Sequence, residues 1–334
     1  MEILVIDRPL VRRLLPMGQC IGAMRKALAG LARGEGVQPL RTIMWLPEKK
    51  GAIGLMPGYT ADPPAAGVKV VTVFPQNHGT EFDSHQGAVL LFHAQHGYLL
   101  ALAEAGEITA IRTAAVSAVA SDLLARPQAG DLAILGSGVQ ARQHLEAMSC
   151  VRDLRRVRVW SPTREHREDF AARLSGRFGC RVEAMRGPRE TVEGADLICT
   201  TTFASQPVLE GGWLAPGCHI NAVGSSLPTA RELDSQAVLR SRLFIDRLES
   251  TLNEAGDFLI PKEEGVIDDS HIQGEIGDIL EGKIEGRRGH HEITLFKSLG
   301  LAVEDVQAVE WIYRQALSQG VGEKVPFGGP KEAD

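Results

Sequence analysis

Apolar positions in the first part of the chain change their spacing at about residue 40. Between residues 17 and 34 they recur with the i, i+3, i+4 spacing of an amphipathic helix, at Ile21, Met24, Leu28 and Leu31. From residue 40 to 75 the apolar runs become short and are separated by glycine and proline, which predicts strands of a mixed or antiparallel sheet. The predicted strands are 42–46, 53–56 and 68–74.

A polar segment then separates these strands from two further apolar runs. Residues 76–88 read QNHGTEFDSHQGA, a composition typical of a loop near a site or on the surface. Beyond the loop, residues 90–92 and 98–102 predict another pair of strands. Residues 109–125 are rich in alanine, which favours a helix, and Arg112 is the single cation near its start.

After Pro127 and Gly130 the pattern becomes a regular alternation of short strands and helices. The expected strands are 131–135, 157–160, 181–185, 195–199, 219–223 and 243–246. The expected helices are 139–150, 164–178 and 190–194. Such alternation is typical of a doubly wound parallel sheet, so the fold class is α/β. We expect the tail from Val321 to Asp334 to be loosely ordered.

Composition narrows the class of protein. The 334 residues include 36 Lys and Arg against 42 Asp and Glu, a formal net charge of −6. Binding to nucleic acid phosphates needs a cationic surplus on at least one face, so we expect no nucleic-acid partner. No window approaches 18 uninterrupted apolar residues, which predicts no membrane span and a cytoplasmic protein. Five cysteines without a CxxC pair indicate a reducing compartment, and the length suggests two domains.

The chain has 36 glycines, more than the usual share, and two of them stand in one motif. The run from Gly136 to Ala141 reads GSGVQA, directly follows the predicted strand 131–135 and opens the next helix. In this position Gly136 makes the tight turn and Gly138 lets the backbone approach a pyrophosphate, while the helix N-terminus offers N–H groups to the anion. A glycine turn without a ligand is the plain alternative. The strand-turn-helix context favours a dinucleotide site.

The end of the second strand of this sheet bears on the choice of cofactor. An NAD enzyme usually carries Asp or Glu there for the ribose 2′-OH, whereas a 2′-phosphate needs cations and hydroxyls. The sequence after Trp160 carries no acid at this point, and we expect NADP(H) with its phosphate near Ser161, Thr163 and Arg164. NAD(H) is the alternative cofactor, since Arg164 would also serve simply to open the next helix.

Three cations stand where the pattern is otherwise apolar or small. Arg41 lies at a strand start, Lys69 interrupts a strand of valine and glycine, and Arg112 begins the alanine-rich helix. Each would ordinarily be a solvated or paired surface charge. Together, such cations bind a carboxylate, which arginine holds in bidentate fashion. The pair His93 and His96 lacks the glutamate of an HExxH motif, so we expect no metal site.

Five ordered motifs resemble the ornithine cyclodeaminase/mu-crystallin family, over about residues 5–318. They are Lys69-Val-Val71 with Pro75 and Asn77, Ala110-Ile-Arg-Thr-Ala-Ala115, Gly136-Ser-Gly-Val-Gln-Ala141, Asn221-Ala-Val-Gly224 with Arg231-Glu-Leu-Asp234, and Thr294-Leu-Phe-Lys-Ser-Leu-Gly-Leu-Ala302. The resemblance implies a homodimer in which a Rossmann dinucleotide-binding domain is inserted into an α+β substrate and dimerisation domain. The expected boundaries are 1–118 for the substrate domain, 119–298 for the Rossmann domain, and 299–334 for a C-terminal helix and tail that return to the first domain.

The same resemblance implies roles for individual residues. Arg41, Lys69 and Arg112 would hold the carboxylate of an amino or imino acid, and Leu299 would line the substrate site. The dinucleotide would contact a wider set, namely Ser84, Arg112, Gly136, Gly138, Val139, Gln140, Thr202, Val223 and Ser298. Cyclodeaminases of the family carry an aspartate two residues after the glycine of the NAVG strand, where this chain has Ser226. A serine hydroxyl without an activating base cannot shuttle a proton near neutral pH as a carboxylate does.

A serine at this position resembles the pattern of the ketimine reductases of the family, including mu-crystallin. The resemblance therefore implies NADPH-dependent reduction of a cyclic ketimine carboxylate, 1-pyrroline-2-carboxylate or 1-piperideine-2-carboxylate, to L-proline or L-pipecolate. Lys69, or a water held by Ser226, would protonate the imine. The alternatives are an ornithine cyclodeaminase, an alanine dehydrogenase of the same family, or a non-catalytic NADPH-binding protein.

Overall fold

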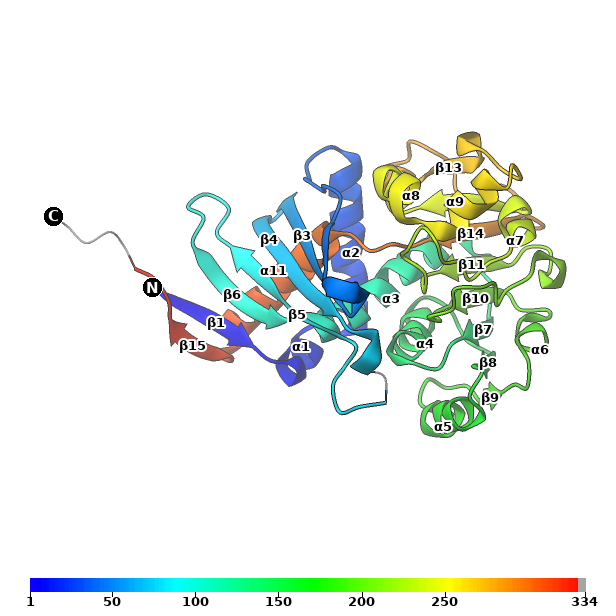
Figure 1. Ribbon diagram of the computed structural model, residues 1–334, viewed down its shortest axis with the longest axis horizontal. Helices are drawn as coiled ribbons and strands as arrows, with labels where there is room; N and C mark the ends of the chain where they lie inside the picture. The colour runs from blue at the N-terminus through cyan, green and yellow to red at the C-terminus, as the bar shows by residue number, and fades with distance from the viewer. Residues whose placement is uncertain (78, 330–334) are drawn as a thin grey trace. The chain divides into compact units, whose positions relative to one another are not determined.

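The computed structural model describes residues 1–77 and 79–329 and divides the chain into two units (Figure 1). Unit 1 comprises Met1–Arg112 and the returning segment from Leu301, and unit 2 comprises Thr113–Gly300. The boundary between Arg112 and Thr113 falls inside one helix, α3 (Ala105–Leu124). These limits differ from the expected boundaries at 118/119 and 298/299.

Unit 1 is built on a mixed sheet. Within the described residues it has seven strands in the order β15-β1-β6-β5-β4-β3-β2, with β1 parallel to β6 and the other pairs antiparallel. The strands are β1 (Glu2–Ile6), β2 (Thr42–Trp45), β3 (Ala52–Ala61), β4 (Pro64–Val73), β5 (His85–Phe92), β6 (Leu99–Glu104) and β15 (Glu323–Pro326). The helices are α1 (Arg8–Leu14), α2 (Met17–Ala32), the start of α3 and α11 (Ala302–Gln319).

Helix α11 packs against α2 and against strands β3, β4 and β5. Two strand glycines make this close approach necessary. A Cβ at Gly58 would meet the backbone of Ala302 and Val303, and a Cβ at Gly67 would meet the Val306 side chain at 2.9 Å. The first turn of α11 therefore lies directly over the middle of β3 and β4.

Several predictions for unit 1 need correction. β3 and β4 form a hairpin longer than the predicted strands 53–56 and 68–74, and β5 starts at His85, inside the predicted polar loop. The tail is also more ordered than expected, because Glu323–Pro326 pairs with β1 in antiparallel register. The segment EKVP is a polar edge strand, so it has no apolar alternation from which a strand could be predicted. Residues 330–334 of the expected tail lie outside the described residues.

Unit 2 contains a wholly parallel sheet, as its alternating pattern predicted. Its eight strands, counted over the described residues, run in the order β13-β12-β14-β11-β10-β7-β8-β9. They are β7 (Asp131–Leu135), β8 (Arg156–Trp160), β9 (Val182–Ala184), β10 (Leu197–Thr200), β11 (His219–Ala222), β12 (Ser241–Ile245), β13 (Ile272–Glu275) and β14 (Ile293–Lys297). β10 and β11 are buried along their whole length, as expected for a sheet covered on both faces. The predicted α/β class is confirmed.

The helices of unit 2 are mostly short. They are the rest of α3, from Thr113 onward, and α4 (Val139–Val151), α5 (Arg164–Leu174), α6 (Pro188–Val192), α7 (Ser235–Leu239), α8 (Leu248–Glu254), α9 (Gly256–Glu263) and α10 (Ile276–Leu280). α5 ends four residues before the predicted Phe178, since Gly176 takes a φ of +81°. The pattern did not resolve α7 to α10, whose five to eight residues are too few to show a helical period.

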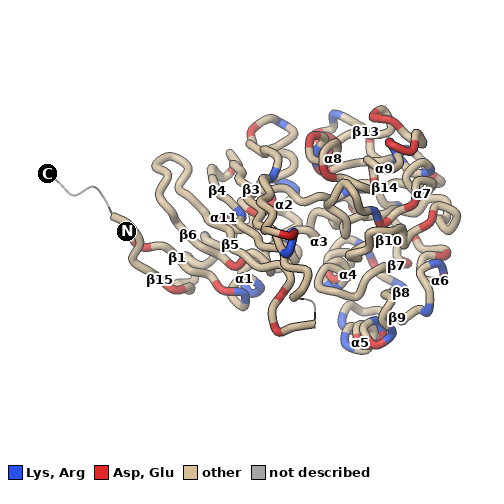
Figure 2. The backbone as a smooth tube through the Cα atoms, viewed as in Figure 1, with Lys and Arg blue, Asp and Glu red and all other residues tan. Residues whose placement is uncertain are grey.

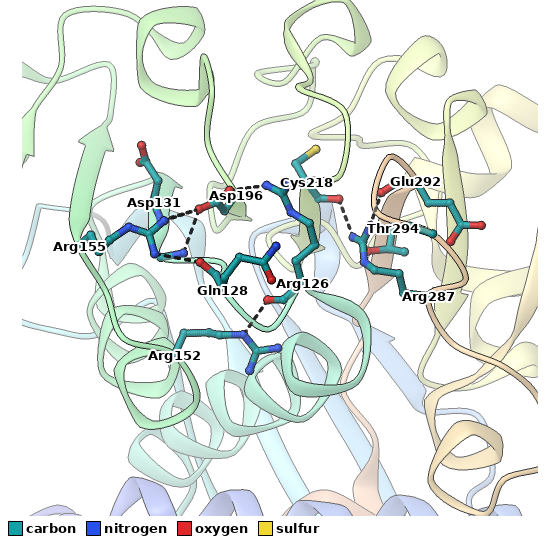
Figure 3. Close-up of polar contacts among 12 residues, drawn as sticks. Arg126, Gln128, Asp131, Arg152, Arg155, Asp196, Cys218, Arg287, Glu292 and Thr294 are labelled. Atoms are coloured by element: carbon teal, nitrogen blue, oxygen red, sulfur yellow. Dashed lines mark hydrogen bonds and ion pairs between the residues drawn. The ribbon is translucent and has the colours of Figure 1, made fainter.

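The amino-terminal edge of this sheet is closed by arginine side chains (Figure 3). Asp196 accepts from Arg126 at 2.5 Å, from the backbone N–H groups of Gly130 and Asp131, and from Arg155 at 3.1 Å. These donors outweigh burial and lower the pKa of Asp196. Its contacts tie the starts of β7 and β10 together.

Two further arginines cap the end of α3. Arg152 donates to the carbonyl oxygen of Arg126 at 3.2 Å (Figure 3). It also donates to the carbonyl oxygen of Ser121 at 2.8 Å, and Arg287 donates to that of Leu124 at 2.5 Å. Cations at a helix C-terminus complement its macrodipole and its unbonded carbonyls. This edge is therefore structural. In sheets of this kind ligands bind at the opposite edge, beyond the carboxyl ends of the strands.

Candidate active site

Unit 1 buries two of the three predicted cations side by side. Lys69, in the middle of β4, and Arg112, on α3, expose only 3% and 4% of their side chains. Both contact Asp305 in the first turn of α11: Lys69 Nζ lies 2.7 Å from Oδ2, and Arg112 Nε lies 3.0 Å from Oδ1. Arg112 Nη1 also donates to Glu304 Oε2 at 2.7 Å.

The local sequence explains why a lysine lies at this depth. Along the first half of β4, Ala65, Gly67 and Lys69 alternate onto the buried face, and α11 covers that face. Gly67 gives Val306 its space, which brings Asp305 down to the lysine. Strands β3 to β6 otherwise carry almost no charge, so they are nearly all tan in Figure 2. An isolated charge there requires partners from elsewhere in the chain.

Arg41, the third cation, lies half-buried just before β2, and its positive charge acts on Lys69. Burial, and then the charge of Arg112, lower the pKa of Lys69 to about 8, although Asp305 opposes the change. For Arg112, Asp305 and Glu304 outweigh burial and raise the pKa. Lys69 and Arg112 therefore share the carboxylate of Asp305, and Arg112 also pairs with Glu304. Cations held side by side in this way can bind a carboxylate.

Ser84 also belongs to unit 1. It lies immediately before β5, where its hydroxyl is 3.0 Å from His85 Nδ1 and its carbonyl accepts from the Phe74 N–H at 2.8 Å. Burial and the charge of Lys69 lower the pKa of His85, so this ring lies close enough to Lys69 for an electrostatic interaction.

In unit 2 the predicted glycine turn has the required backbone. Gly136 has a φ of +120°, and a Cβ there would press on the Thr201 side chain and carbonyl. Gly138 is the N-cap of α4, no side chain caps this helix, and nothing lies within 4 Å of where its Cβ would be. Val139 is 57% exposed. The N–H groups of the first turn are thus open to an anion.

Two buried polar atoms support the same assignment. Gln140 Oε1 and Ser298 Oγ are both inaccessible to solvent and have no hydrogen-bond partner in the structure. Buried polar atoms are nearly always bonded, and these two are among nine buried side-chain atoms of the described residues that lack a hydrogen-bond partner. Together with the open glycine turn they fit a dinucleotide.

The glycine turn is bonded to the end of β8. Ser137 Oγ donates to Ser161 Oγ at 2.9 Å, which links the glycine turn to that strand end. Thr163 is the N-cap of α5 without a side-chain cap bond. Arg164 is exposed and donates to Glu168 at 2.7 Å. The chain places no carboxylate directly after Trp160.

A buried carboxylate fixes the loops after β10 and β11. Glu232 accepts from Thr200 Oγ1 and Thr202 Oγ1 at 2.7 Å, and from the N–H groups of Thr202 and Gly224 at 2.6 Å. Burial, and then the charge of Asp257, raise the pKa of Glu232. Asp257 accepts the N–H of Glu232 at 2.8 Å and pairs with Lys297 at 2.8 Å. These bonds place Thr202 and Val223 at the carboxyl edge.

Leu299 and Ser226 occupy different environments at this edge. Leu299 is 7% exposed, and its N–H donates to Asp246 Oδ2 at 2.5 Å. Ser226 is exposed, in the turn that follows Gly224. The predicted site residues thus form two groups: the cations and Ser84 in unit 1, and the remaining residues around the carboxyl edge of unit 2.

Sequence reasoning missed the acidic residues of both groups. Asp305 and Glu304 stand in the first turn of a helix, where acids usually serve the helix dipole at the surface. Glu232 belongs to the Arg231–Asp234 motif, which does not by itself predict a role for its side chain. The one available signal is that Glu304 and Asp305 interrupt an apolar run, LAVEDVQAV, just as Lys69 interrupts its strand.

No group of three or more His, Cys, Asp or Glu side chains is arranged to hold a metal ion in the part of the chain that the structure describes. None of the helices over the same residues is long and apolar enough to span a membrane.

A parallel doubly wound sheet with an open glycine turn defines a dinucleotide-binding protein. The chain belongs to the ornithine cyclodeaminase/mu-crystallin family, whose profile matches residues 2–320. It is 40% identical to the ketimine reductase mu-crystallin of Mus musculus over 297 residues, 88% of this chain and 90% of that protein. The protein is therefore an oxidoreductase that acts on carbon–nitrogen bonds.

Two solved structures are similar over nearly the whole chain. One is the Thermococcus litoralis Delta(1)-pyrroline-2-carboxylate reductase in complex with NADH and L-proline, at 40% identity and a TM-score of 0.94, covering 97% of this chain and 100% of that one. The other is an archaeal alanine dehydrogenase dimer with bound NAD, at 29% identity and a TM-score of 0.93, covering 98% and 100%. The resemblance inferred from the five motifs is confirmed.

Proposed function

We propose that the protein reduces a cyclic ketimine carboxylate, 1-pyrroline-2-carboxylate or 1-piperideine-2-carboxylate, to L-proline or L-pipecolate, with NADPH as the preferred cofactor. The observation that carries this proposal is the buried cluster in which Lys69 and Arg112 both pair with Asp305. Relatives that reduce ketimines, and one solved with NADH and L-proline, support the same reaction class.

The cations bind the substrate carboxylate. The side chain of Arg112 uses Nε and Nη1 for Asp305 and Glu304, which leaves the Nη2 edge for a substrate oxygen. The carboxylate carbon of the substrate is bonded directly to the ring carbon of the C=N bond, so fixing the carboxylate also fixes the reacting carbon. Orientation of this kind supplies part of the catalysis because the reacting carbon is held in one place.

Lys69 holds the proton that the imine nitrogen needs. With a pKa of about 8, the ammonium still carries its proton at neutral pH yet gives it up more readily than an exposed lysine. The nitrogen thus becomes an iminium, whose carbon accepts the hydride; the products are the amine and a neutral lysine that takes a proton back from solvent. Ser226 would assist by ordering a water molecule.

The dinucleotide is held by the carboxyl edge of unit 2. Gly136, Gly138 and Val139 would contact its pyrophosphate, and the unpartnered Gln140 and Ser298 would take bonds from it. Thr202 and Val223 would contact it from the loops that Glu232 fixes, and Ser84 and Arg112 of unit 1 remain proposed contacts. When bound, the cofactor supplies the hydride.

The preference for NADPH follows from the end of β8. No acid stands there to bind a ribose 2′-OH and repel a phosphate, while Ser161, Thr163 and Arg164 offer hydroxyls and a cation. Arg164 now pairs with Glu168, but both side chains are exposed and water screens the pair, so a phosphate would compete with Glu168 for the guanidinium.

We also propose a homodimer formed through unit 1. Its edge strand β2 and the neighbouring β3 expose Ile43, Met44, Trp45 and Leu55 by 40–54% each. Contiguous exposed apolar side chains of this size mark interaction surfaces. A Trp45→Glu variant should then sediment as a monomer, and an unchanged sedimentation coefficient would contradict this interface.

One assay panel tests the reaction. NADPH oxidation is measured with 1-pyrroline-2-carboxylate, 1-piperideine-2-carboxylate, and pyruvate with ammonia, and ammonia release is measured with L-ornithine. The proposal expects the cyclic imines to be turned over fastest, by at least about tenfold in kcat/KM. Faster turnover of pyruvate, or ammonia release from ornithine as the main activity, would overturn it.

A further inference from the structure

We propose that Asp305 is a positioning residue for the substrate carboxylate: its two oxygens bridge Lys69 and Arg112 and hold both cations in one orientation. This inference rests on the proposed function and names a residue to which the reaction assigned no role. Asp305 Oδ2 lies 2.7 Å from Lys69 Nζ, Oδ1 lies 3.0 Å from Arg112 Nε, and the carboxylate is fully buried.

The bridge decides which N–H groups remain for the substrate. An ammonium has three donors. That of Lys69 lies 2.7 Å from Asp305 Oδ2 as an ion pair and donates to Thr109 Oγ1 at 3.5 Å. On Arg112, Asp305 and Glu304 together engage the Nε–Nη1 edge and fix the plane of the guanidinium. Two cations that would repel each other are thereby held within reach of one carboxylate.

The bridge also keeps Lys69 charged. The groups that act on its ammonium come from every element around it: Asp305 on α11, Arg112 on α3, Arg41 before β2 and His85 on β5. Burial and the two arginines favour the neutral amine, and Asp305 is the negative charge that opposes them. His85 has a lowered pKa and is uncharged in the alkaline range. Without Asp305, Lys69 would therefore lose its proton at lower pH.

The discriminating experiment is the pH profile of kcat/KM for 1-pyrroline-2-carboxylate in wild type and Asp305→Asn. The alkaline limb reports the free enzyme, and we assign it to Lys69. In D305N this limb should move toward acid by about one pH unit or more, so that the loss of activity is large at pH 8 and partly regained at pH 6. Asp305→Glu, which restores the charge, should move the limb back toward its wild-type position.

Three controls separate positioning from mere stability. Asp257→Asn removes an equally buried aspartate, paired with Lys297 in unit 2, and should lower the melting temperature without moving the limb. Glu304→Gln should raise KM without moving it, because Glu304 bonds Arg112 and not Lys69. In a Lys69→Arg background the limb should vanish, and adding D305N should not restore it.

An equal loss of activity at every pH in D305N, with the limb in place, would overturn the inference. If the wild type turns over no cyclic imine, the proposed function fails, but Asp305 remains testable. Binding of pyrrole-2-carboxylate, a planar ring carboxylate, is then followed by calorimetry across the same pH range. A limb that shifts in D305N supports the bridge, whereas identical pH dependence, or no binding to the wild type, overturns it.

Discussion

The two units each bury a small group of charges, and the two groups are built differently. In unit 1, Lys69 and Asp305 pair at 2.7 Å; in unit 2, Lys297 and Asp257 pair at 2.8 Å, and all four side chains are 0–3% exposed. Asp257 also accepts two backbone N–H groups, those of Glu232 and Leu233, whereas Asp305 pairs with two side-chain cations.

The difference separates a structural role from a binding role. In unit 2, Asp257 pairs with Lys297, and the bonds of Glu232 and Asp257 to backbone and hydroxyl groups hold loops in place. In unit 1 the carboxylates of Asp305 and Glu304 pair instead with the charged side chains of Lys69 and Arg112. We propose that these cations bind a ligand, whereas the group in unit 2 holds loops in place.

The largest effect is expected from a substitution that disrupts the charged group in unit 1. Lys69→Met removes both a carboxylate ligand and the proposed proton donor, so kcat for the cyclic imine should fall by about 10³-fold or more. Dinucleotide affinity, measured by fluorescence titration, should stay within about twofold, because the glycine turn lies in the other unit. Lys50→Met, at an exposed pair with Glu48, is the matched control and should leave both quantities unchanged. Wild-type turnover by K69M would refute the assignment.

The second effect breaks the group in unit 2. Glu232→Gln keeps the size of the side chain but replaces one carboxylate oxygen with an NH₂ group. Donors that bond to that oxygen in the wild type would then face another donor. We expect a loss of about 2 kcal/mol in the free energy of unfolding and about a tenfold loss in dinucleotide affinity, since Thr202 and Gly224 lose their acceptor. The alkaline limb of kcat/KM should not move. If it moved as in D305N, the distinction between the two groups would fail.

A smaller effect concerns the missing carboxylate. Ser226→Asp adds a group that can take a proton from an amine, so slow ammonia release from L-ornithine should become measurable. Imine reduction should slow by about tenfold, because a second carboxylate opposes the binding of an anionic substrate. Ser226→Asn, similar in size but uncharged, should reduce activity without releasing ammonia. Equal ammonia release by S226N and S226D would rule out a carboxylate effect.

The smallest effect tests the cofactor preference. Arg164→Ala should raise KM for NADPH by about fivefold, the loss of one exposed contact to a phosphate, and leave KM for NADH unchanged. Arg173→Ala, which removes a comparable exposed i,i+4 pair on the same helix, is the control. A parallel rise for both cofactors would mean that Arg164 does not contact the 2′-phosphate.

The sequence predicted the parallel sheet, the glycine turn and the three cations, because each interrupts or continues a local pattern. It did not predict β15, whose polar residues are held by backbone bonds to β1. Nor did it predict roles for Asp305 and Glu232, since the role of a carboxylate depends on which residues it bonds. Asp305 bonds Arg112 across 193 residues, and Glu232 bonds Thr202 across 30. No local pattern records such distances along the chain.

The return of α11 to unit 1 also sets an order of events during synthesis. Lys69 and Arg112 leave the ribosome 193 or more residues before Asp305. At about 5–20 residues per second, they wait on the order of 10 to 40 s for the carboxylate that allows them to be buried. Residues 113–300 are complete before that moment. The last segment made is thus the one that closes the first, and until it arrives the cations of the nascent chain remain hydrated.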